Sequence, residues 1–388
     1  MAADLAILTN ARAADQRSMI GYGELLLKAA RRSGYEVTEF RSASLLSRMA
    51  PGSVAGRPFA KLLGNLDRFI VSPLALAGRR ADIVHVVDPG NIPYLDVVRH
   101  RASVVTVHDV IPYLCAAEHL DGFRPTANGR RLMAAILRRL KRVDRVVCVS
   151  ENTRRDLLSL IELDPARVVT IPNAVFQPMR PVTDEECSAV RERLGLPPDG
   201  PIILHVGSNS FYKNRATVLE VFARVAARHP RALLLFVGPR SADLVARTAA
   251  LGLEKDVHFA ERADRADMAA IYSAASVLLF PSFYEGFGYP VLEAQLCGTP
   301  VVCSNAGSLA EVGGDAVMMA NPRDTEALAL SLDRLLKDSR LREHLRRAGM
   351  VNARRFELEC WRESHDRLYR LLSVSRPAVP LVGEEGTQ

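Results

Sequence analysis

Short apolar runs alternate along this chain with longer stretches in which apolar residues recur at helical spacing. Such alternation predicts βα units built around parallel sheets. The runs at 202–206 and 233–237 are apolar at nearly every position, which indicates strands that are buried on both faces. We predict twelve strands, at residues 5–9, 35–40, 83–87, 104–108, 146–149, 168–171, 202–206, 233–237, 257–259, 277–280, 301–303 and 317–319.

The number of predicted units is too large for one domain, and a chain of 388 residues suits two domains of similar size. Pro178 and Pro181 break the periodicity near the middle, and Asp184 begins an acidic run suited to the first turn of a helix. We therefore predict α/β domains at 1–176 and 177–355. A helix at 356–375 is expected to pack back on the first domain, before a mobile tail at 376–388.

Composition adds constraints on cellular location and redox chemistry. The chain is 48% hydrophobic and 24% charged, which is typical of globular domains. No apolar stretch reaches the roughly 18 residues of a membrane-spanning helix, and the first residues lack the order of a secretory signal, so we expect a cytoplasmic protein. The six cysteines lie far apart without a C-x-x-C pair, which argues against a metal or disulfide framework.

Charge is distributed unevenly along the chain. The first 175 residues carry 25 Lys and Arg against 17 Asp and Glu, whereas the remainder carries 26 against 27. The first half is therefore expected to meet an anionic partner such as a lipid surface. Its most basic stretch, 129–145, fits two structures equally well: an interfacial helix on anionic lipid, or a core-facing helix with a solvated basic face. Nucleic-acid binding is disfavoured because aromatic residues are not interleaved with the cations.

Candidate chemistry concentrates in residues 281–293, which read PSFYEGFGYPVLE. A predicted strand runs into a glycine-containing turn and then a helix start, an arrangement that points backbone N–H groups at an anion. Gly286 and Gly288 lack a Cβ atom, so a ligand can approach the main chain closely. Glu285 and Glu293 bracket the turn with seven residues between them, so they can reach opposite ends of one bound molecule.

This segment resembles the E-x7-E motif of the retaining GT-B glycosyltransferases of family 4, E-G-F-G-x-P-x-x-E, with Tyr289 at a position where an aliphatic residue is commoner. The resemblance implies the GT-B fold, an α/β architecture of two Rossmann-like doubly wound domains that face a central cleft. It also implies that Glu285 contacts a donor sugar and Glu293 a ribose. The amides around Gly286, Phe287, Gly288 and Tyr289 would then face the sugar and its pyrophosphate.

A second element, residues 207–215, reads GSNSFYKNR and follows the predicted strand at 202–206. Lys213 and Arg215 arrive at a helix start, where cations are disfavoured unless an anion is bound. The element resembles the family's G-x-(loop)-R-K-N segment, which implies that Gly207, Lys213 and Asn214 bind the donor diphosphate. Tyr212 replaces the usual Arg, and we infer that Arg215 supplies the second positive charge.

Residues of the first half complete the predicted site. His108 and Asp109 follow a buried strand at its carboxyl end, where ligands bind in doubly wound sheets, and the family has a similar H-D pair near the donor sugar and acceptor. Gly21 resembles part of a glycine-containing first loop that closes over both substrates, although a plain helix start explains it comparably well. His85 is predicted to be a hydrogen-bonded strand residue. Residues 308–311 form a capping-box pattern, S-L-A-E.

The resemblance implies a retaining glycosyltransferase, with Glu285, His108 and Lys213 as its catalytic residues. It would move a hexose-type sugar from a UDP- or GDP-linked donor to a saccharide or lipid-linked saccharide, in bacterial surface polysaccharide synthesis. Peripheral attachment to the inner face of the cell membrane would bring the basic half to lipid. No D-x-D or H-E-x-x-H segment occurs, so no metal and no cofactor are expected. The alternatives are a sugar-nucleotide epimerase of the same architecture and a non-catalytic nucleotide-sugar-binding protein.

Overall fold

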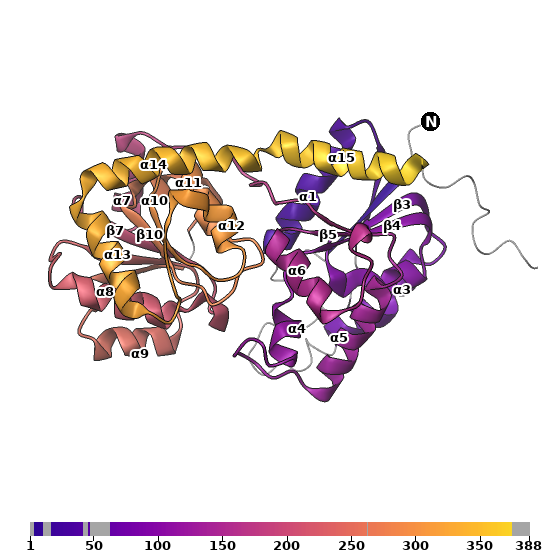
Figure 1. The fold of residues 1–388 in the computed structure, drawn as a ribbon, viewed down its shortest axis with the longest axis horizontal. Helices are drawn as coiled ribbons and strands as arrows, with labels where there is room; N and C mark the ends of the chain where they lie inside the picture. Colours follow the sequence, from indigo (N-terminus) through magenta and orange to yellow (C-terminus); the bar gives the residue numbers. More distant parts are fainter. Residues whose placement is uncertain (1–3, 11–16, 42–45, 47–62, 262, 375–388) are drawn as a thin grey trace, which may run out of the picture. The chain divides into compact units, whose positions relative to one another are not determined.

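The computed structural model describes residues 4–10, 17–41, 46, 63–261 and 263–374 (Figure 1). The chain divides into two compact units. The first comprises Met1–Val149, Thr153–Pro172 and Leu358–Gln388, and the second comprises Ser150–Asn152 and Asn173–Glu357. The tail predicted at 376–388 lies outside the described residues. So does much of the segment between residues 40 and 82.

The first unit contains a six-stranded parallel sheet in the order β2-β1-β3-β4-β5-β6. This is the flavodoxin-like order with one further strand. The direction in which successive strands are added to the sheet reverses between β1 and β3. The strands are β1 (Asp4–Thr9), β2 (Glu36–Arg41), β3 (Arg80–Val86), β4 (Arg99–Val107), β5 (Arg145–Cys148) and β6 (Val168–Thr170). The helices of this unit are α1 (Arg17–Arg32), α3 (Ser72–Leu76), α4 (Ile111–Ala116), α5 (Ala127–Leu140), α6 (Glu151–Leu160, whose first two residues fall in the second unit) and α15 (Leu358–Val374).

The second unit contains a six-stranded parallel sheet in the order β12-β11-β10-β7-β8-β9. In chain order this is the 3-2-1-4-5-6 arrangement of dinucleotide-binding domains, which reverses between β7 and β10. The strands are β7 (Ile202–Val206), β8 (Leu233–Val237), β9 (Val257–Ala260), β10 (Val277–Phe280), β11 (Val301–Ser304) and β12 (Met318–Ala320). Its helices are α7 (Asp184–Arg193), α8 (Arg215–Ala226), α9 (Ala242–Ala250), α10 (Met268–Ala274), α11 (Tyr289–Leu296), α12 (Leu309–Gly313), α13 (Thr325–Lys337) and α14 (Ser339–Ala353).

All twelve predicted strands are present, with ends that differ by a few residues. The near-continuous apolar runs are buried on both faces, as predicted: β8 is buried along its whole length, and β7 at all but its last residue. The acidic run after Pro181 opens α7, as predicted. Thr183 accepts a hydrogen bond from the Glu186 amide, and the Glu186 carboxylate accepts one from the Thr183 amide. This reciprocal cap fixes where the helix begins.

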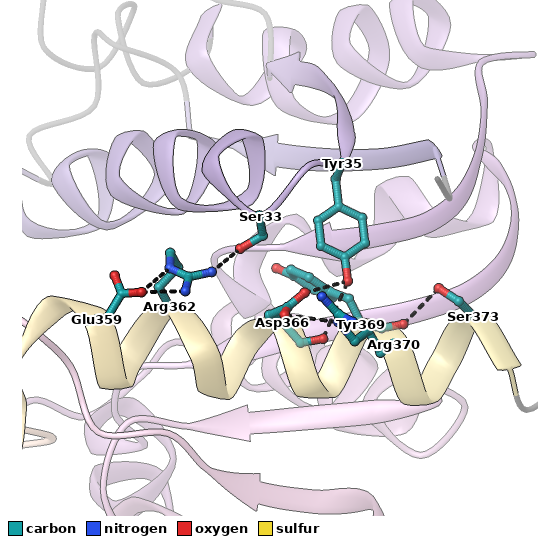
Figure 2. Close-up of polar contacts among 8 residues, drawn as sticks. All are labelled: Ser33, Tyr35, Glu359, Arg362, Asp366, Tyr369, Arg370 and Ser373. Carbon is teal, nitrogen blue, oxygen red and sulfur yellow. Dashed lines mark hydrogen bonds and ion pairs between the residues drawn. The ribbon is translucent and has the colours of Figure 1, made fainter. Parts of the chain in front are cut away.

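The C-terminal helix α15 belongs to the first unit and packs against α1 and β3. Figure 2 shows its polar contacts: Arg362 donates to the Ser33 hydroxyl at 2.6 Å, and the Tyr35 hydroxyl donates to Asp366 Oδ1 at 2.9 Å. Trp361 and Leu368 of α15 are buried. The helix is therefore docked by apolar burial, with hydrogen bonds that specify its register.

The prediction of a loop at Gly21 is wrong, because α1 already begins at Arg17 and Gly21 lies inside this helix. Gly23 of this helix serves packing. A Cβ atom on Gly23 would lie 3.1 Å from Thr9 Cγ2, so the missing side chain lets α1 approach the end of β1. Tyr22, which lies between Gly21 and Gly23 in sequence, is buried.

The basic stretch forms α5, whose Ile136 and Leu140 are buried while Arg130, Arg131 and Arg138 are exposed. Core packing therefore accounts for the most deeply buried apolar positions of this helix, and its arginines present a solvated basic face. Across the part of the chain that the structure describes, no helix combines the length and the apolar character needed to cross a membrane.

Candidate functional site

The turn between β10 and α11 is held in place by Ser308 at the start of α12. The Ser308 amide and hydroxyl donate to the Glu285 carbonyl at 3.1 and 3.0 Å, and the hydroxyl also lies 2.7 Å from the Phe287 carbonyl. Gly307 permits this contact: its φ is +59°, and a Cβ atom would lie 2.6–2.7 Å from the Glu285 carbonyl oxygen and amide nitrogen. The backbone that carries Glu285 is therefore fixed before any ligand arrives.

The prediction of a capping box at 308–311 is wrong. Ser308 makes no side-chain cap hydrogen bond to α12, because its hydroxyl is used by the turn. The Glu311 carboxylate accepts hydrogen bonds from the amides of Glu151 and Asn152, which belong to the second unit. The residue types of a capping box are present, but the side chains of Ser308 and Glu311 both make tertiary hydrogen bonds instead of capping α12.

Gly288 gives the turn its shape. Its φ of +100° lies in the left-handed region, and it immediately precedes α11, which has Pro290 in its first turn. Phe287 is buried and packs edge-to-face against Phe356 at 5.6 Å, so it anchors the turn. Gly286 accepts a hydrogen bond from the Ser150 hydroxyl at 2.7 Å, and the Tyr289 ring packs on Phe176. Gly286 and Gly288 thus shape the turn through the main chain, whereas Phe287 and Tyr289 pack through their rings.

Two of the predicted catalytic residues meet in the second unit. Lys213 Nζ lies 2.8 Å from Glu285 Oε1, with 13% and 9% of the two side chains exposed. The lysine chain passes over Gly207, where a Cβ atom would lie 3.4 Å from Lys213 Cγ and Cδ, and its ammonium stands 5.0 Å above the Phe280 ring. Both members of this ion pair are largely withdrawn from water, beside the carboxyl ends of β7 and β10.

Glu293 lies inside α11 and is held by Tyr272 of α10, whose hydroxyl donates to Glu293 Oε2 at 2.7 Å. Burial raises the pKa of Glu293, while the hydrogen bond from Tyr272 and the charges of Lys213 and Arg265 act in the opposite direction. Lys213 therefore influences both glutamates. Sequence reasoning missed Tyr272, because a buried tyrosine in a short helix carries no signal of the carboxylate that it meets.

Arg215 opens α8 and is buried, with no carboxylate partner among the described residues. Its Nη1 donates to Asn209 and to the Pro239 carbonyl, and the guanidinium stacks over Phe236. Within the part of the chain that the structure describes, Nε and Nη2 have no hydrogen-bond partner. Burial lowers the pKa of Arg215 to about 10. Such a cation lacks the compensating charge that buried ions need.

The side-chain amide of Asn214 is engaged within the protein. Its φ is +51°, and its Nδ2 donates to the carbonyls of Pro281 and Pro322 at 2.9 and 3.0 Å. Because both amide hydrogens are used, they are not available for the predicted substrate contact. The residue instead ties the loop after β7 to those after β10 and β12.

In the first unit, His108 Nε2 donates to the Val87 carbonyl at 2.8 Å, and its ring meets the Tyr22 ring edge-to-face at 4.8 Å. Burial lowers the pKa of His108, against the opposing effects of the Val87 carbonyl and Asp88. Asp109 Oδ1 accepts a hydrogen bond from the Ile111 amide at the start of α4. His85 is hydrogen-bonded within the core, as predicted.

Sequence reasoning also missed a polar cluster at the carboxyl ends of β1 and β3, the strands between which the strand order of the first sheet reverses. Asn10 follows β1 and donates to Asp88 Oδ2, after β3, at 2.8 Å, and Asn91 donates to Asn10 Oδ1 at 2.6 Å. A signal was available, because polar residues directly after neighbouring parallel strands gather at one edge of a sheet. Among the described residues, no group of three or more His, Cys, Asp or Glu side chains gathers to hold a metal ion.

The second unit thus brings together Lys213, the carboxylates of Glu285 and Glu293, and the amides at the start of α11. They lie beside β7 and β10, the strands between which the strand order of this doubly wound sheet reverses. Open sheets of this kind bind ligands outside the carboxyl ends of their strands at that point. Helix amides with a lysine suit a phosphate, and carboxylates suit hydroxyl groups. The arrangement can therefore hold a molecule that combines phosphates with hydroxyls.

Two family models match the chain. Residues 188–351 match the model described as glycosyl transferases group 1, and residues 24–176 match glycosyltransferase family 4. Among curated proteins, O-antigen chain mannosyltransferase B of Escherichia coli is 29% identical over 279 residues, which is 71% of each chain. D-inositol 3-phosphate glycosyltransferase of Salinispora arenicola is 27% identical over 361 residues, 87% of this chain and 79% of that protein.

Solved structures show the same fold. Sucrose-phosphate synthase from Thermosynechococcus elongatus aligns with a TM-score of 0.72 at 22% identity, over 96% of this chain and 99% of that one. WaaG, a glycosyltransferase involved in lipopolysaccharide biosynthesis, aligns with a TM-score of 0.68 at 19% identity, over 94% and 99%. The two parallel sheets of this chain are those of the GT-B architecture, as predicted.

Proposed function

This chain belongs to the group 1 glycosyltransferases, and we propose that it moves a hexose from a nucleoside diphosphate sugar to a saccharide or lipid-linked saccharide with retention at the anomeric carbon. The observation that carries the proposal is the contact between Lys213 and Glu285 beside the start of α11, with Glu293 one turn inside that helix. Escherichia coli relatives are named mannosyltransferases, so mannose is the first sugar to test.

In this proposal the donor diphosphate lies against the amides before α11 and the ammonium of Lys213. The bond between the anomeric carbon and the diphosphate breaks, and Lys213 stabilises the charge that develops on the departing oxygen. The acceptor hydroxyl forms the new bond from the same face, and its proton passes to the departing diphosphate. Glu285 binds the sugar and Glu293 the ribose hydroxyls. Arg215 adds the second positive charge that the loop otherwise lacks.

We propose that no divalent metal takes part, because Lys213 and the helix amides supply the charge that a metal would. Sugar transfer should then be unchanged by EDTA. A loss of activity that Mg²⁺ or Mn²⁺ restores would contradict this part of the proposal.

The test of the donor site is a thermal-shift screen of UDP, GDP and their sugars. A ligand present at 100 times its dissociation constant stabilises the folded state by about 2.7 kcal/mol. Lys213→Ala should abolish the shift and the transfer of sugar. Lys337→Ala is the matched control, because this lysine is exposed and, among the described residues, pairs with Asp333 on its own helix. Wild-type binding by Lys213→Ala would refute the site.

The exposed arginines of α5 are the surface through which we propose contact with anionic lipid. Each cation near an anionic membrane contributes about 1 kcal/mol. Arg130→Glu combined with Arg138→Glu should abolish sedimentation with phosphatidylglycerol vesicles. Vesicles of phosphatidylcholine alone serve as the control. Equal sedimentation of the wild-type protein and the double variant with anionic vesicles would contradict the proposed lipid contact of α5.

A further inference from the structure

A buried hydrogen-bond network joins α1, β3, β4 and α15 within the first unit. Its members are Tyr22, His85, Thr106, His365 and Tyr369, and each is at most 2% exposed. The Tyr22 hydroxyl lies 3.0 Å from both Thr106 Oγ1 and His365 Nε2. His85 lies between Thr106 Oγ1, at 2.7 Å from Nε2, and the Tyr369 hydroxyl, at 2.6 Å from Nδ1.

The direction of every hydrogen bond follows from one fixed end. His365 Nδ1 lies 2.9 Å from the Trp361 carbonyl, which can only accept, so Nδ1 carries the hydrogen. Burial lowers the pKa of His365 to about 4, so Nε2 is an acceptor at neutral pH. The Tyr22 hydroxyl must then donate to His365, which leaves its oxygen to accept from Thr106.

The same reasoning fixes the other half of the chain of hydrogen bonds. Because the Thr106 hydrogen is directed at Tyr22, Thr106 Oγ1 accepts from His85 Nε2. His85 Nδ1 is then an acceptor, and the Tyr369 hydroxyl donates to it. Each proton has one place, and each of these side chains has a partner. A fully satisfied network in a dry core holds its members in a single arrangement.

Tyr22 carries this constraint to His108. Their rings meet at 4.8 Å with an interplanar angle of 88°, and Trp361 of α15 packs edge-to-face on Tyr22 at 5.5 Å. His108 Nε2 donates to the Val87 carbonyl, so its Nδ1 is a lone pair without a partner among the described residues. The orientation of this ring is thus set by one carbonyl and one aromatic neighbour.

We propose that Tyr22 and His365 are positioning residues, through which the C-terminal helix fixes the His108 ring with Nδ1 free to accept a hydrogen bond from a substrate hydroxyl. Only the identity of that hydroxyl rests on the proposed function. The positioning itself depends on contacts within the first unit. It gives α15 a role in the candidate site although about 250 residues separate it from His108 in sequence.

The experiment uses the full chain labelled with ¹⁵N at histidine. Ring ¹H–¹⁵N spectra distinguish the two tautomers, and His108→Gln and His365→Gln assign the signals. We expect hydrogen on Nε2 of His108 and on Nδ1 of His365. His365→Leu, which removes the acceptor for Tyr22, should shift the His108 ring signals. His365→Gln places an amide oxygen near the position of Nε2 and should restore most of the wild-type spectrum.

Ser33→Ala is the matched control, because it removes a hydrogen bond that docks α15 without touching the network (Figure 2). It should leave the His108 signals unchanged. Turnover by His365→Leu should fall roughly tenfold through misplacement of His108, while the affinity for nucleoside diphosphate stays within twofold. If His365→Leu does not fold, Tyr22→Phe decides, since it keeps the ring and loses only the hydroxyl.

Two results would overturn the inference: hydrogen on Nδ1 of His108, or His108 signals that do not move in folded His365→Leu and Tyr22→Phe. If the wild-type protein transfers no sugar from any donor, the proposed function fails. The spectra still decide the positioning, so the two failures are distinguishable.

Discussion

The contact between Lys213 and Glu285 allows the stability of the second unit to be separated from ligand binding. Lys213→Met or Glu285→Gln leaves one charge in a site where the partners are only 13% and 9% exposed. Breaking a fully buried pair in this way costs about 3–5 kcal/mol. Because both side chains keep some contact with water, we expect about 2–3 kcal/mol for each single variant. The double variant keeps neither charge and should lose less than about 1 kcal/mol.

Urea unfolding followed by far-UV circular dichroism measures these differences. Trp361 is the single tryptophan and belongs to the first unit, so its fluorescence reports a transition that the variants should leave unchanged. The double variant should be folded yet bind no nucleoside diphosphate. A double-mutant coupling energy within about 0.5 kcal/mol of zero would refute the desolvated pair. Wild-type nucleotide affinity in the double variant would refute the place of the Lys213–Glu285 pair in the binding site.

Three further changes test how the two units are built. Gly307→Ala should lose about 1–3 kcal/mol more than Gly195→Ala, because both have positive φ but only Gly307 meets backbone at 2.6 Å; equal losses by urea unfolding would contradict the close contact. Tyr272→Phe should weaken nucleoside diphosphate binding by calorimetry roughly tenfold, since a hydrogen bond to a carboxylate is worth about 1.5–3 kcal/mol; a change in stability alone would make Tyr272 merely structural. Burial lowers the pKa of His365 from 6.5 to about 4, so the folded state binds fewer protons than the unfolded state between these values; the urea midpoint of tryptophan fluorescence should fall as pH drops from 6.5 towards 4, and a constant midpoint would contradict neutral burial.

The fold was predictable because strand periodicity is local and these strands are strongly apolar. Runs such as those of β7 and β8 cannot be solvent-exposed, so burial on both faces follows from composition alone. The start of α7 was predictable for the same reason, since a capping box lies within four residues of sequence. The helix start before Gly21 was missed. Gly21 and Gly23 suggested a turn, but the buried helix face formed by Tyr22, Leu25 and Leu26 favours a continuous helix.

The candidate site was predictable only where it depends on residue type at close spacing. The segment that carries Glu285 was found because glycine, proline and carboxylate occur together. Its support by Ser308 was not found, because that serine is 23 residues away and its sequence pattern fits an ordinary helix cap. Asn214 shows the converse, since a polar residue inside a recognised segment was used by the protein for its own loops.

Hydrogen-bond satisfaction differs between two sets of buried polar side chains in this chain. In the first unit, the hydroxyls and imidazoles of Tyr22, His85, Thr106, His365 and Tyr369 pair with one another, whereas Nε1 of the neighbouring Trp361 has no partner among the described residues. In the second unit, three buried side chains near β7 and β10 have polar atoms without a hydrogen-bond partner among the described residues: His205 Nε2, Ser282 Oγ, and Nε and Nη2 of Arg215. They follow or belong to β7 and β10, the strands between which the order reverses. Since buried polar groups in folded proteins are almost always paired, we expect a ligand or ordered water to pair with these atoms beside β7 and β10.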